Sequence, residues 1–239
     1  MSFDLVSPLG WTWTLLPHEE CVAGTPWTLW SAGTHEEATR QQLAQLDLAR
    51  PDQREAFAKS AMFVVLWPVA RALAGTVAGM DVRGLRVLEV GCGLALPSLV
   101  AARGGARVLA TDHHPDVLAL VGRNAATNGV RLDVGVLDWT SDRPAGRFDL
   151  VLASDVLFAA DCAQTLPAFL LDVLEPGGRA LVADPCRPWH DAFEARCREV
   201  GLTVVTELVD DALISTLTLA DPAVVPTIPF DGQHVLARE

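Results

Sequence analysis

The sequence predicts an α/β protein whose main sheet is doubly wound, seven-stranded and closed by an antiparallel pair of strands at its edge. Short apolar runs alternate with helical stretches from about residue 85, which predicts parallel strands joined by right-handed crossovers. A glycine-rich turn follows the first of these runs. The last two runs are separated by only three residues around Asp210-Asp211, a spacing that favours an antiparallel pair.

Each element has its own boundary signals. Gly104-Gly105 ends the first helix, Pro115 precedes the second where a first helical turn tolerates proline, and Asn128-Gly129 ends it. Pro176-Gly177-Gly178 forms the turn before the fifth strand. The predicted strands are 86–90, 108–111, 132–137, 150–153, 180–183, 203–209 and 213–219, and the predicted helices are 96–103, 117–128, 164–174 and 191–200.

Residues 1–60 differ from the remainder of the chain. Four of the seven tryptophans fall here, and residues 35–50 are polar and permit a helix until Arg50-Pro51-Asp52 breaks the run. We interpret 1–60 as a cap segment that packs on a main domain of residues 61–239.

Composition narrows the class of partner. The chain has 239 residues, half of them hydrophobic, which is enough for one α/β domain with some decoration. A net charge of −12 repels phosphate backbones and anionic lipids, so we expect neither nucleic acid nor membrane as a partner and favour a cationic one.

The cysteines and the N-terminus indicate the compartment. The five cysteines contain no C-x-x-C pair, which argues against a disulfide framework and a zinc site, and we expect no metal. The N-terminus lacks the basic region of a signal peptide, and the apolar runs are shorter than a membrane span. We therefore expect a cytoplasmic protein.

The first strand leads into Glu89-Val90-Gly91-Cys92-Gly93-Leu94-Ala95. Glycines there let a ligand approach the backbone at the carboxyl end of the sheet. The last glycine of a dinucleotide-binding loop is replaced by Leu96, and a Walker Gly-Lys-Ser/Thr is absent. Glu89 would repel pyrophosphate but can accept from a cationic amino group. The stretch resembles the Glu/Asp-x-Gly-x-Gly-x-Gly motif of class I methyltransferases, which implies S-adenosylmethionine as cofactor, bound in part by Gly91, Cys92 and Gly93.

Two further acids follow the next two strands. Asp112 ends the second strand, where a carboxylate can bridge two ribose hydroxyls, as it does in that family. Asp138-Trp139 follows the third, where Asp138 can accept from the adenine amine while Trp139 packs on the ring. Each acid alone could be a solvated strand end. Three in succession, each suited to a different part of one cofactor, favour a cofactor site.

A narrower resemblance concerns the acceptor side. Asp155-x-x-Phe158 after the fourth strand resembles the Asp/Glu-x-x-Tyr/Phe motif of the seven-β-strand lysine methyltransferases, the nicotinamide N-methyltransferase-like group. Trp67-Pro68 resembles that group's Trp-Pro segment near the cofactor. The run from Asp184 to Arg187-Pro188 resembles the Asp-Pro-x-Arg-Pro of the branch that methylates lysines of the electron-transfer flavoprotein β subunit.

This resemblance implies a Rossmann-like methyltransferase that methylates a protein lysine. Asp155 would hold the amine and Phe158 would wall the lysine channel. Asp184 and Arg187 would shape the acceptor rim, and Trp67 would lie near the cofactor. Alternatively, Asp155 is a helix cap, Phe158 is a core residue, and Arg187 is a loop anchor paired with Asp184.

Two other functions stay open from sequence. One is methylation of a small-molecule amine or pyridine, and the other is cofactor binding without catalysis. A cap that closes over the site would favour the small molecule, whereas a wide acidic mouth would favour a protein.

Overall fold

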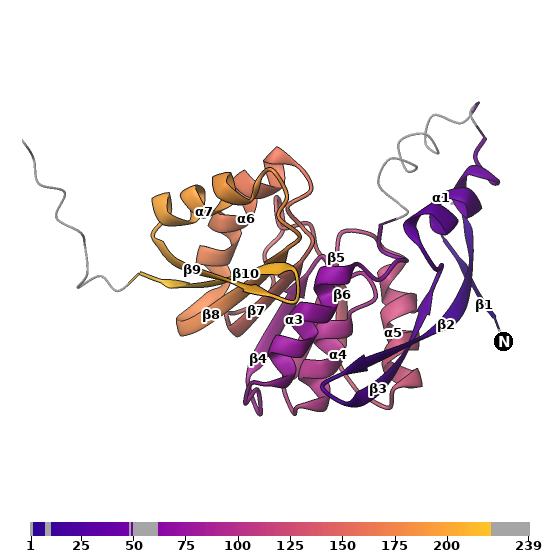
Figure 1. Ribbon diagram of the computed structural model, residues 1–239, viewed down its shortest axis with the longest axis horizontal. Helices are drawn as coiled ribbons and strands as arrows, with labels where there is room; N and C mark the ends of the chain where they lie inside the picture. Colours follow the sequence, from indigo (N-terminus) through magenta and orange to yellow (C-terminus); the bar gives the residue numbers. More distant parts are fainter. Residues whose placement is uncertain (1, 8–10, 48, 50–61, 221–239) are drawn as a thin grey trace, which may run out of the picture.

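The computed structural model describes residues 2–7, 11–47, 49 and 62–220. The main sheet is built from β4 (Arg86–Val90), β5 (Arg107–Asp112), β6 (Asp133–Val136), β7 (Phe148–Ser154), β8 (Leu174–Asp184), β9 (Leu202–Val209) and β10 (Ala212–Leu219). Their order is β6-β5-β4-β7-β8-β10-β9 (Figure 1). The strands from β6 to β8 pair in parallel, and β10 is antiparallel to both β8 and β9. The predicted doubly wound seven-stranded sheet with its antiparallel hairpin is confirmed.

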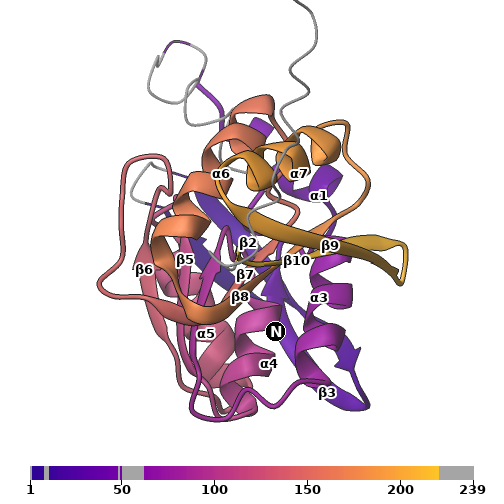
Figure 2. The same ribbon diagram turned by 90° about the vertical axis from the view of Figure 1, so that its left-hand side faces the viewer.

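Helices cover both faces of this sheet (Figure 2). They are α3 (Pro68–Ala78), α4 (Leu96–Arg103) and α5 (Val117–Thr127) on one face, and α6 (Ala160–Val173) and α7 (His190–Glu199) on the other. Successive strand residues alternate between the two hydrophobic clusters beneath these layers. In β7, Leu150 and Leu152 face the α3 and α4 layer, whereas Val151 and Ala153 face α6 and α7. This period of two explains why the strands read as continuous apolar runs.

Two predicted elements begin several residues early, and helix α3 was not predicted from the sequence. Helix α6 begins at Ala160, not at 164, because Cys162 and Ala163 extend its buried stripe by one turn towards the N-terminus. Strand β8 begins at Leu174 and contains the Pro176-Gly177-Gly178 stretch, with a register irregularity opposite Phe148 and Leu150. The turn residues therefore bend a strand here instead of preceding one.

The N-terminal region forms a second, three-stranded antiparallel sheet of β1 (Phe3–Val6), β2 (Thr12–Val22) and β3 (Thr25–Ser31), followed by α1 (His35–Leu43). It lies at the opposite end of the molecule from the β9–β10 hairpin (Figure 1). Sequence analysis predicted no strands here, although Trp11, Trp13 and Leu15 alternate with exposed or half-buried residues. These side chains belong to the same hydrophobic cluster as α3 and α4. The predicted domain boundary at residue 60 lies outside the described residues.

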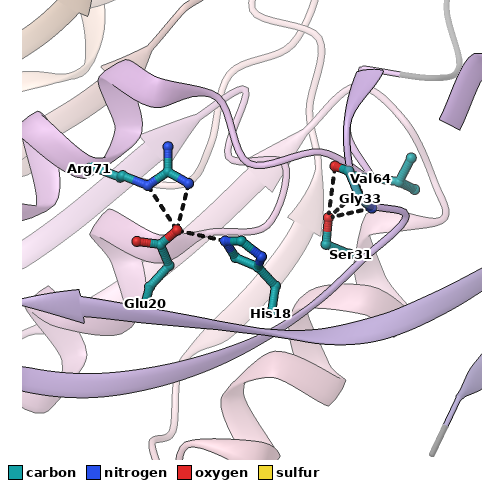
Figure 3. Close-up of polar contacts among 6 residues, drawn as sticks. All are labelled: His18, Glu20, Ser31, Gly33, Val64 and Arg71. Carbon is teal, nitrogen blue, oxygen red and sulfur yellow. Dashed lines mark hydrogen bonds and ion pairs between the residues drawn. The ribbon is translucent and has the colours of Figure 1, made fainter. Parts of the chain in front are cut away.

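Polar contacts attach this sheet to the main domain. Arg71 of α3 donates from Nε and Nη2 to Glu20 Oε1, at 2.8 and 2.5 Å, and His18 contacts the same oxygen (Figure 3). On α5, Asn124 Oδ1 accepts from the backbone N–H of Trp30 at 2.7 Å. Asn128 Oδ1 and Nδ2 bond the backbone N–H and C=O of Thr28. The two asparagine side chains thus pair with backbone groups on the edge of β3 that faces away from β2.

Within the described part of the chain, every helix is too short or too polar to cross a membrane.

Candidate functional site

A cavity opens at the carboxyl ends of β4, β5 and β7, on the edge where parallel strands of this fold bind ligands. It is open to solvent, and its empty space, open mouth included, is about 950 Å³. Its lining comes from the 62–70 segment, the glycine loop, the ends of β5 and β7, and single residues beyond β6 and β8. None of the described residues of the N-terminal sheet or α1 lines it.

The glycine loop has three residues in the left-handed region, Gly91 (φ 63°), Gly93 (φ 49°) and Ala95 (φ 62°). A Cβ on Gly91 would lie 2.8 Å from Val156 Cγ1, so glycine is required there for space as well as conformation. Ala95 occupies the position of the third glycine in the predicted motif and adopts the same conformation at a cost of about 1–2 kcal/mol. The loop geometry is therefore kept despite the substitution.

Asp112 lies in the cavity lining directly beside this loop. Its Oδ2 accepts from the backbone N–H of Gly93 at 3.1 Å, and its Oδ1 accepts from that of His114 at 3.1 Å. His113 Nδ1 lies 3.2 Å from Oδ1, and the His113 ring also lines the cavity. The carboxylate is thus held in place by backbone amides with its remaining lone pairs available to a ligand hydroxyl.

Glu89 is fully buried beneath the loop and does not line the cavity. Its Oε2 accepts from the backbone N–H of Ser98 in the first turn of α4 at 3.0 Å, whereas Oε1 has no hydrogen-bond partner. Burial raises the pKa of Glu89 to about 8, opposed by the Ser98 hydrogen bonds and reinforced by the Asp112 charge. A buried carboxyl with one free oxygen fits a cationic amino group, which would compensate the cost of ionising it.

The stretch after β6 divides between cavity and solvent. Trp139 is buried in the cavity lining and donates from Nε1 to Thr165 Oγ1 at 3.2 Å. Asp138 is exposed and lies outside the lining, and its Oδ1 accepts from the backbone N–H and the hydroxyl of Thr140. The turn thus satisfies this carboxylate oxygen locally, and the predicted contact of Asp138 with the adenine stays a prediction.

The 62–67 segment forms a cavity wall of which sequence analysis identified only Trp67. Trp67 Nε1 donates to the Met62 carbonyl at 2.9 Å, which folds the segment on itself. Val64 anchors it to the N-terminal sheet, because its carbonyl accepts from Ser31 Oγ at 3.1 Å (Figure 3). The same carbonyl accepts from the Ala32 N–H at 2.9 Å. Phe63, in turn, lies against the loop, with its carbonyl 3.4 Å from where a Gly93 Cβ would be.

Asn124 is another functional candidate that sequence analysis missed. Besides accepting from Trp30, it donates from Nδ2 to the carbonyl of Leu94 in the glycine loop at 3.1 Å. It lies on the buried stripe of α5 with Val117, Leu120 and Val121. An amide on an otherwise apolar stripe is the signal that could have identified it, because a buried polar group needs a partner.

The acceptor side is dominated by an ion pair. Asp155 follows β7 with φ 58°, and its Oδ1 accepts from Arg187 Nε at 2.6 Å and lies 2.5 Å from Nη2. Both residues line the cavity, as does Phe158, which is 48% exposed. Phe158 is therefore no core residue, and Asp155 is not a cap of α6, which has no side-chain cap.

Asp184 lies beneath this pair and not on the cavity surface. It is fully buried, and its Oδ1 accepts from the backbone N–H of Arg187 at 2.6 Å. Its side chain therefore positions the loop of Arg187, and a role of Asp184 at the acceptor rim stays a prediction. Burial raises the pKa of the Asp184 carboxyl, opposed by the Arg187 amide and by the nearby His190.

Cys92 lines the cavity, but its surroundings disfavour the thiolate. Burial first, and then the electrostatic effect of Asp112 and Glu89, raise the pKa of its thiol well above the ordinary value. In the described residues, no group of three His, Cys, Asp or Glu side chains is arranged to hold a metal ion.

Known proteins are similar to this chain in sequence and in fold. A family model described as lysine methyltransferase matches residues 54–192. A protein N-terminal and lysine N-methyltransferase of Eremothecium gossypii is 36% identical over 59% of this chain and 62% of its own length. The electron transfer flavoprotein beta subunit lysine methyltransferase of Mus musculus is 28% identical over 56% of this chain and 54% of its own. The chain thus spans little more than half the length of these relatives.

Among solved structures, a 16S rRNA methyltransferase of T. thermophilus in complex with AdoMet and guanosine superposes with a TM-score of 0.61. It is 17% identical and covers 87% of this chain and 51% of that one, a likeness that supports the fold. The family match extends over more than half of the sequence and includes the glycine loop, Asp112, Asp155 and Arg187. This chain belongs to the lysine methyltransferase family.

Proposed function

We propose that this chain transfers a methyl group from S-adenosylmethionine to a lysine side-chain nitrogen of a protein. The observation that carries the proposal is the placement of the Asp155 carboxylate in the lining of the same cavity as the glycine loop and Asp112. Membership of the lysine methyltransferase family supports the reaction class, and the lysine methyltransferases among its relatives support the acceptor.

The cofactor half of the cavity, with Glu89 buried beneath its glycine loop, has groups suited to the ribose, the apolar surfaces and the ammonium of S-adenosylmethionine. Gly91 and Gly93 allow the backbone to approach it, and Asp112 would accept from its ribose hydroxyls. Trp139 and Trp67 would pack on its apolar surfaces, and Glu89 would compensate its ammonium through Oε1. Asp138 stays a prediction for the adenine amine, since it would first have to leave Thr140. When bound, the cofactor supplies an electrophilic methyl group on a sulfonium.

The acceptor half orients the nucleophile and excludes water. An amine attacks only with a free lone pair, so the neutral form must be present at the sulfonium. Asp155 would accept a hydrogen bond from that amine and aim its lone pair towards the cofactor. Phe158 would cover the aliphatic stem of the lysine, since it is exposed at the cavity lining.

A protein acceptor is favoured over a small molecule by the mouth of the cavity. Phe158 remains accessible, and none of the described residues of the N-terminal sheet closes over the site. The acidic chain, at −12, also suits a basic protein partner. The cytoplasmic location predicted from sequence stays a prediction, supported by five unpaired cysteines.

The test is a transfer assay with methyl-labelled S-adenosylmethionine and a cell lysate, followed by tandem mass spectrometry. We expect labelled methyl-lysine in a protein, and no label when Asp155→Asn replaces the wild-type chain. Label confined to a small molecule would refute the protein substrate, and cofactor binding without any transfer would refute catalysis.

A further inference from the structure

The charge of Asp155 is already matched before any acceptor enters. Arg187 contacts Asp155 Oδ1 through both Nε and Nη2, and no described residue donates to Oδ2. The Asp155 side chain is 6% exposed and that of Arg187 is 30% exposed. The carboxylate is therefore nearly buried, whereas part of the guanidinium side chain stays accessible.

The backbone holds both partners in this arrangement. Asp155 (φ 58°) and Cys186 (φ 63°), the residue before Arg187, both adopt the left-handed conformation that side-chain-bearing residues disfavour. The Asp155 N–H donates to the Ala183 carbonyl at 2.9 Å, and the Arg187 N–H donates to Asp184 Oδ1. Two loops that leave neighbouring strands are thus fixed so that their charged side chains meet.

A carboxylate without this partner would oppose methyl transfer. An unpaired carboxylate attracts the acceptor as an ammonium ion and raises the pKa of that amine. An ammonium ion has no lone pair, so tight binding of the cation would keep the acceptor amine protonated and unreactive. A carboxylate paired with a guanidinium still accepts a hydrogen bond through Oδ2 but presents no net charge to the amine.

We propose that Arg187 is a positioning residue that neutralises Asp155, so that the site selects the neutral amine of the acceptor instead of its ammonium form. This inference rests on the proposed function. The other titratable groups near the Asp155–Arg187 pair are the buried Asp184, with His190 at 3.7 Å, and Asp112 with His113, which also line the cavity. All four stay unchanged in the variants below.

The first test measures binding of n-butylammonium, which mimics the end of a lysine, and needs no turnover. S-Adenosylhomocysteine is kept saturating so that the probe cannot occupy the cofactor half. We expect Arg187→Gln to bind the probe about tenfold more tightly than wild type, because one charge-assisted contact is released. Arg187→Lys keeps the charge and should stay within about threefold of wild type.

Two controls keep this test decisive. Arg187→Met preserves the apolar stem and replaces Arg187→Gln if that variant fails to fold, as judged by thermal unfolding and S-adenosylhomocysteine affinity. The Asp155→Asn/Arg187→Gln double variant should lose the gain. Equal probe affinity in wild type and a folded neutral variant would overturn the proposal, whether or not the chain methylates a protein.

The second test uses the protein acceptor found by the transfer assay. In the pH profile of kcat, one limb reports loss of the proton from the acceptor amine. This limb should move upward by about one pH unit in Arg187→Gln, which is a tenfold shift in the protonation equilibrium of the amine. Its KM should not rise. A neutral variant with an unmoved limb and a merely lower kcat would reduce Arg187 to a structural anchor and overturn the proposal.

Discussion

The two halves of the cavity hold their carboxylates by different means. On the cofactor side, Asp112 in the lining and Glu89 buried beneath the glycine loop accept from backbone amides that lie within 19 residues of them in the chain. In the acceptor half, Asp155 is held by a side chain 32 residues away. Backbone amides keep their position under most substitutions, whereas a guanidinium can be removed by one. The cofactor half is therefore set by local chain geometry, and the acceptor half by one long-range ion pair.

Asp155→Asn should have the largest effect and separate the two halves most sharply. The amide is nearly isosteric but loses the charge that pairs with Arg187 and accepts from the amine. We expect the transfer rate to fall by about 10²- to 10⁴-fold, while S-adenosylhomocysteine affinity by calorimetry stays within about threefold of wild type. A matching loss of cofactor affinity would mean that Asp155 serves the cofactor half.

Asn124→Leu should reduce stability next most strongly. It leaves the buried Trp30 N–H and the Leu94 carbonyl without their partners, at a cost of about 2–4 kcal/mol in the free energy of unfolding measured by urea denaturation. Gly122→Ala on the same helix is the matched control, since nothing lies within 4 Å of the added Cβ. An unchanged midpoint would show that the amide does not connect the N-terminal sheet to the loop.

Asp112→Ala tests the predicted ribose contact. Loss of one charge-assisted hydrogen-bonding group should weaken S-adenosylmethionine binding by about 1.5–3 kcal/mol. Probe binding at Asp155, measured with n-butylammonium, should not change. If cofactor affinity survives this substitution, the carboxylate serves only to hold the loop through Gly93 and His114.

Gly91→Ala tests whether the glycine loop needs a residue without a side chain at this position. The added Cβ would meet Val156 Cγ1 at 2.8 Å in a left-handed conformation, so we expect a loss of about 1–2 kcal/mol in stability. Gly75→Ala in α3, where the Cβ meets nothing within 4 Å, should be neutral or stabilising. Thermal unfolding of the two variants gives the comparison, and equal midpoints would remove the steric argument.

Glu89 provides the smallest effect, a pH dependence. With its pKa raised to about 8 in the folded chain, Glu89 is neutral at pH 7 and must lose a proton to compensate a bound ammonium. Cofactor affinity should therefore rise about fivefold from pH 7 to 8. Stability of the cofactor-free chain should fall over the same range, because the raised pKa stabilises the fold below about 4.5 and that contribution is lost through pH 8.

Glu89→Gln should flatten both dependences. Calorimetry and urea denaturation at pH 6, 7 and 8 measure them, and a persistent slope in the variant would assign the titration to another group.

Local patterns in the sequence determined the sheet, its crossovers, its edge hairpin and the place of the glycine loop. Period-two burial, Gly-rich stops and acids at strand ends are features of neighbouring residues, and their physical consequences are local. For the same reason Gly91, Gly93, Asp112 and Trp139 could be located at the cavity from sequence. The alternation of Trp11, Trp13 and Leu15 with polar residues is an equally local pattern that indicates a strand, but the strands of the N-terminal sheet were not predicted.

Only the tertiary structure decided which polar groups meet. Nothing in the order of residues states that Arg187 turns to Asp155 while its amide binds Asp184, or that Asn124 reaches both Trp30 and Leu94. The contact between Thr140 and Asp138, by contrast, joins residues two positions apart within one turn. The Asp155–Arg187 and Asn124 pairings join residues 30 to 94 positions apart, so they depend on how strands and helices pack in three dimensions.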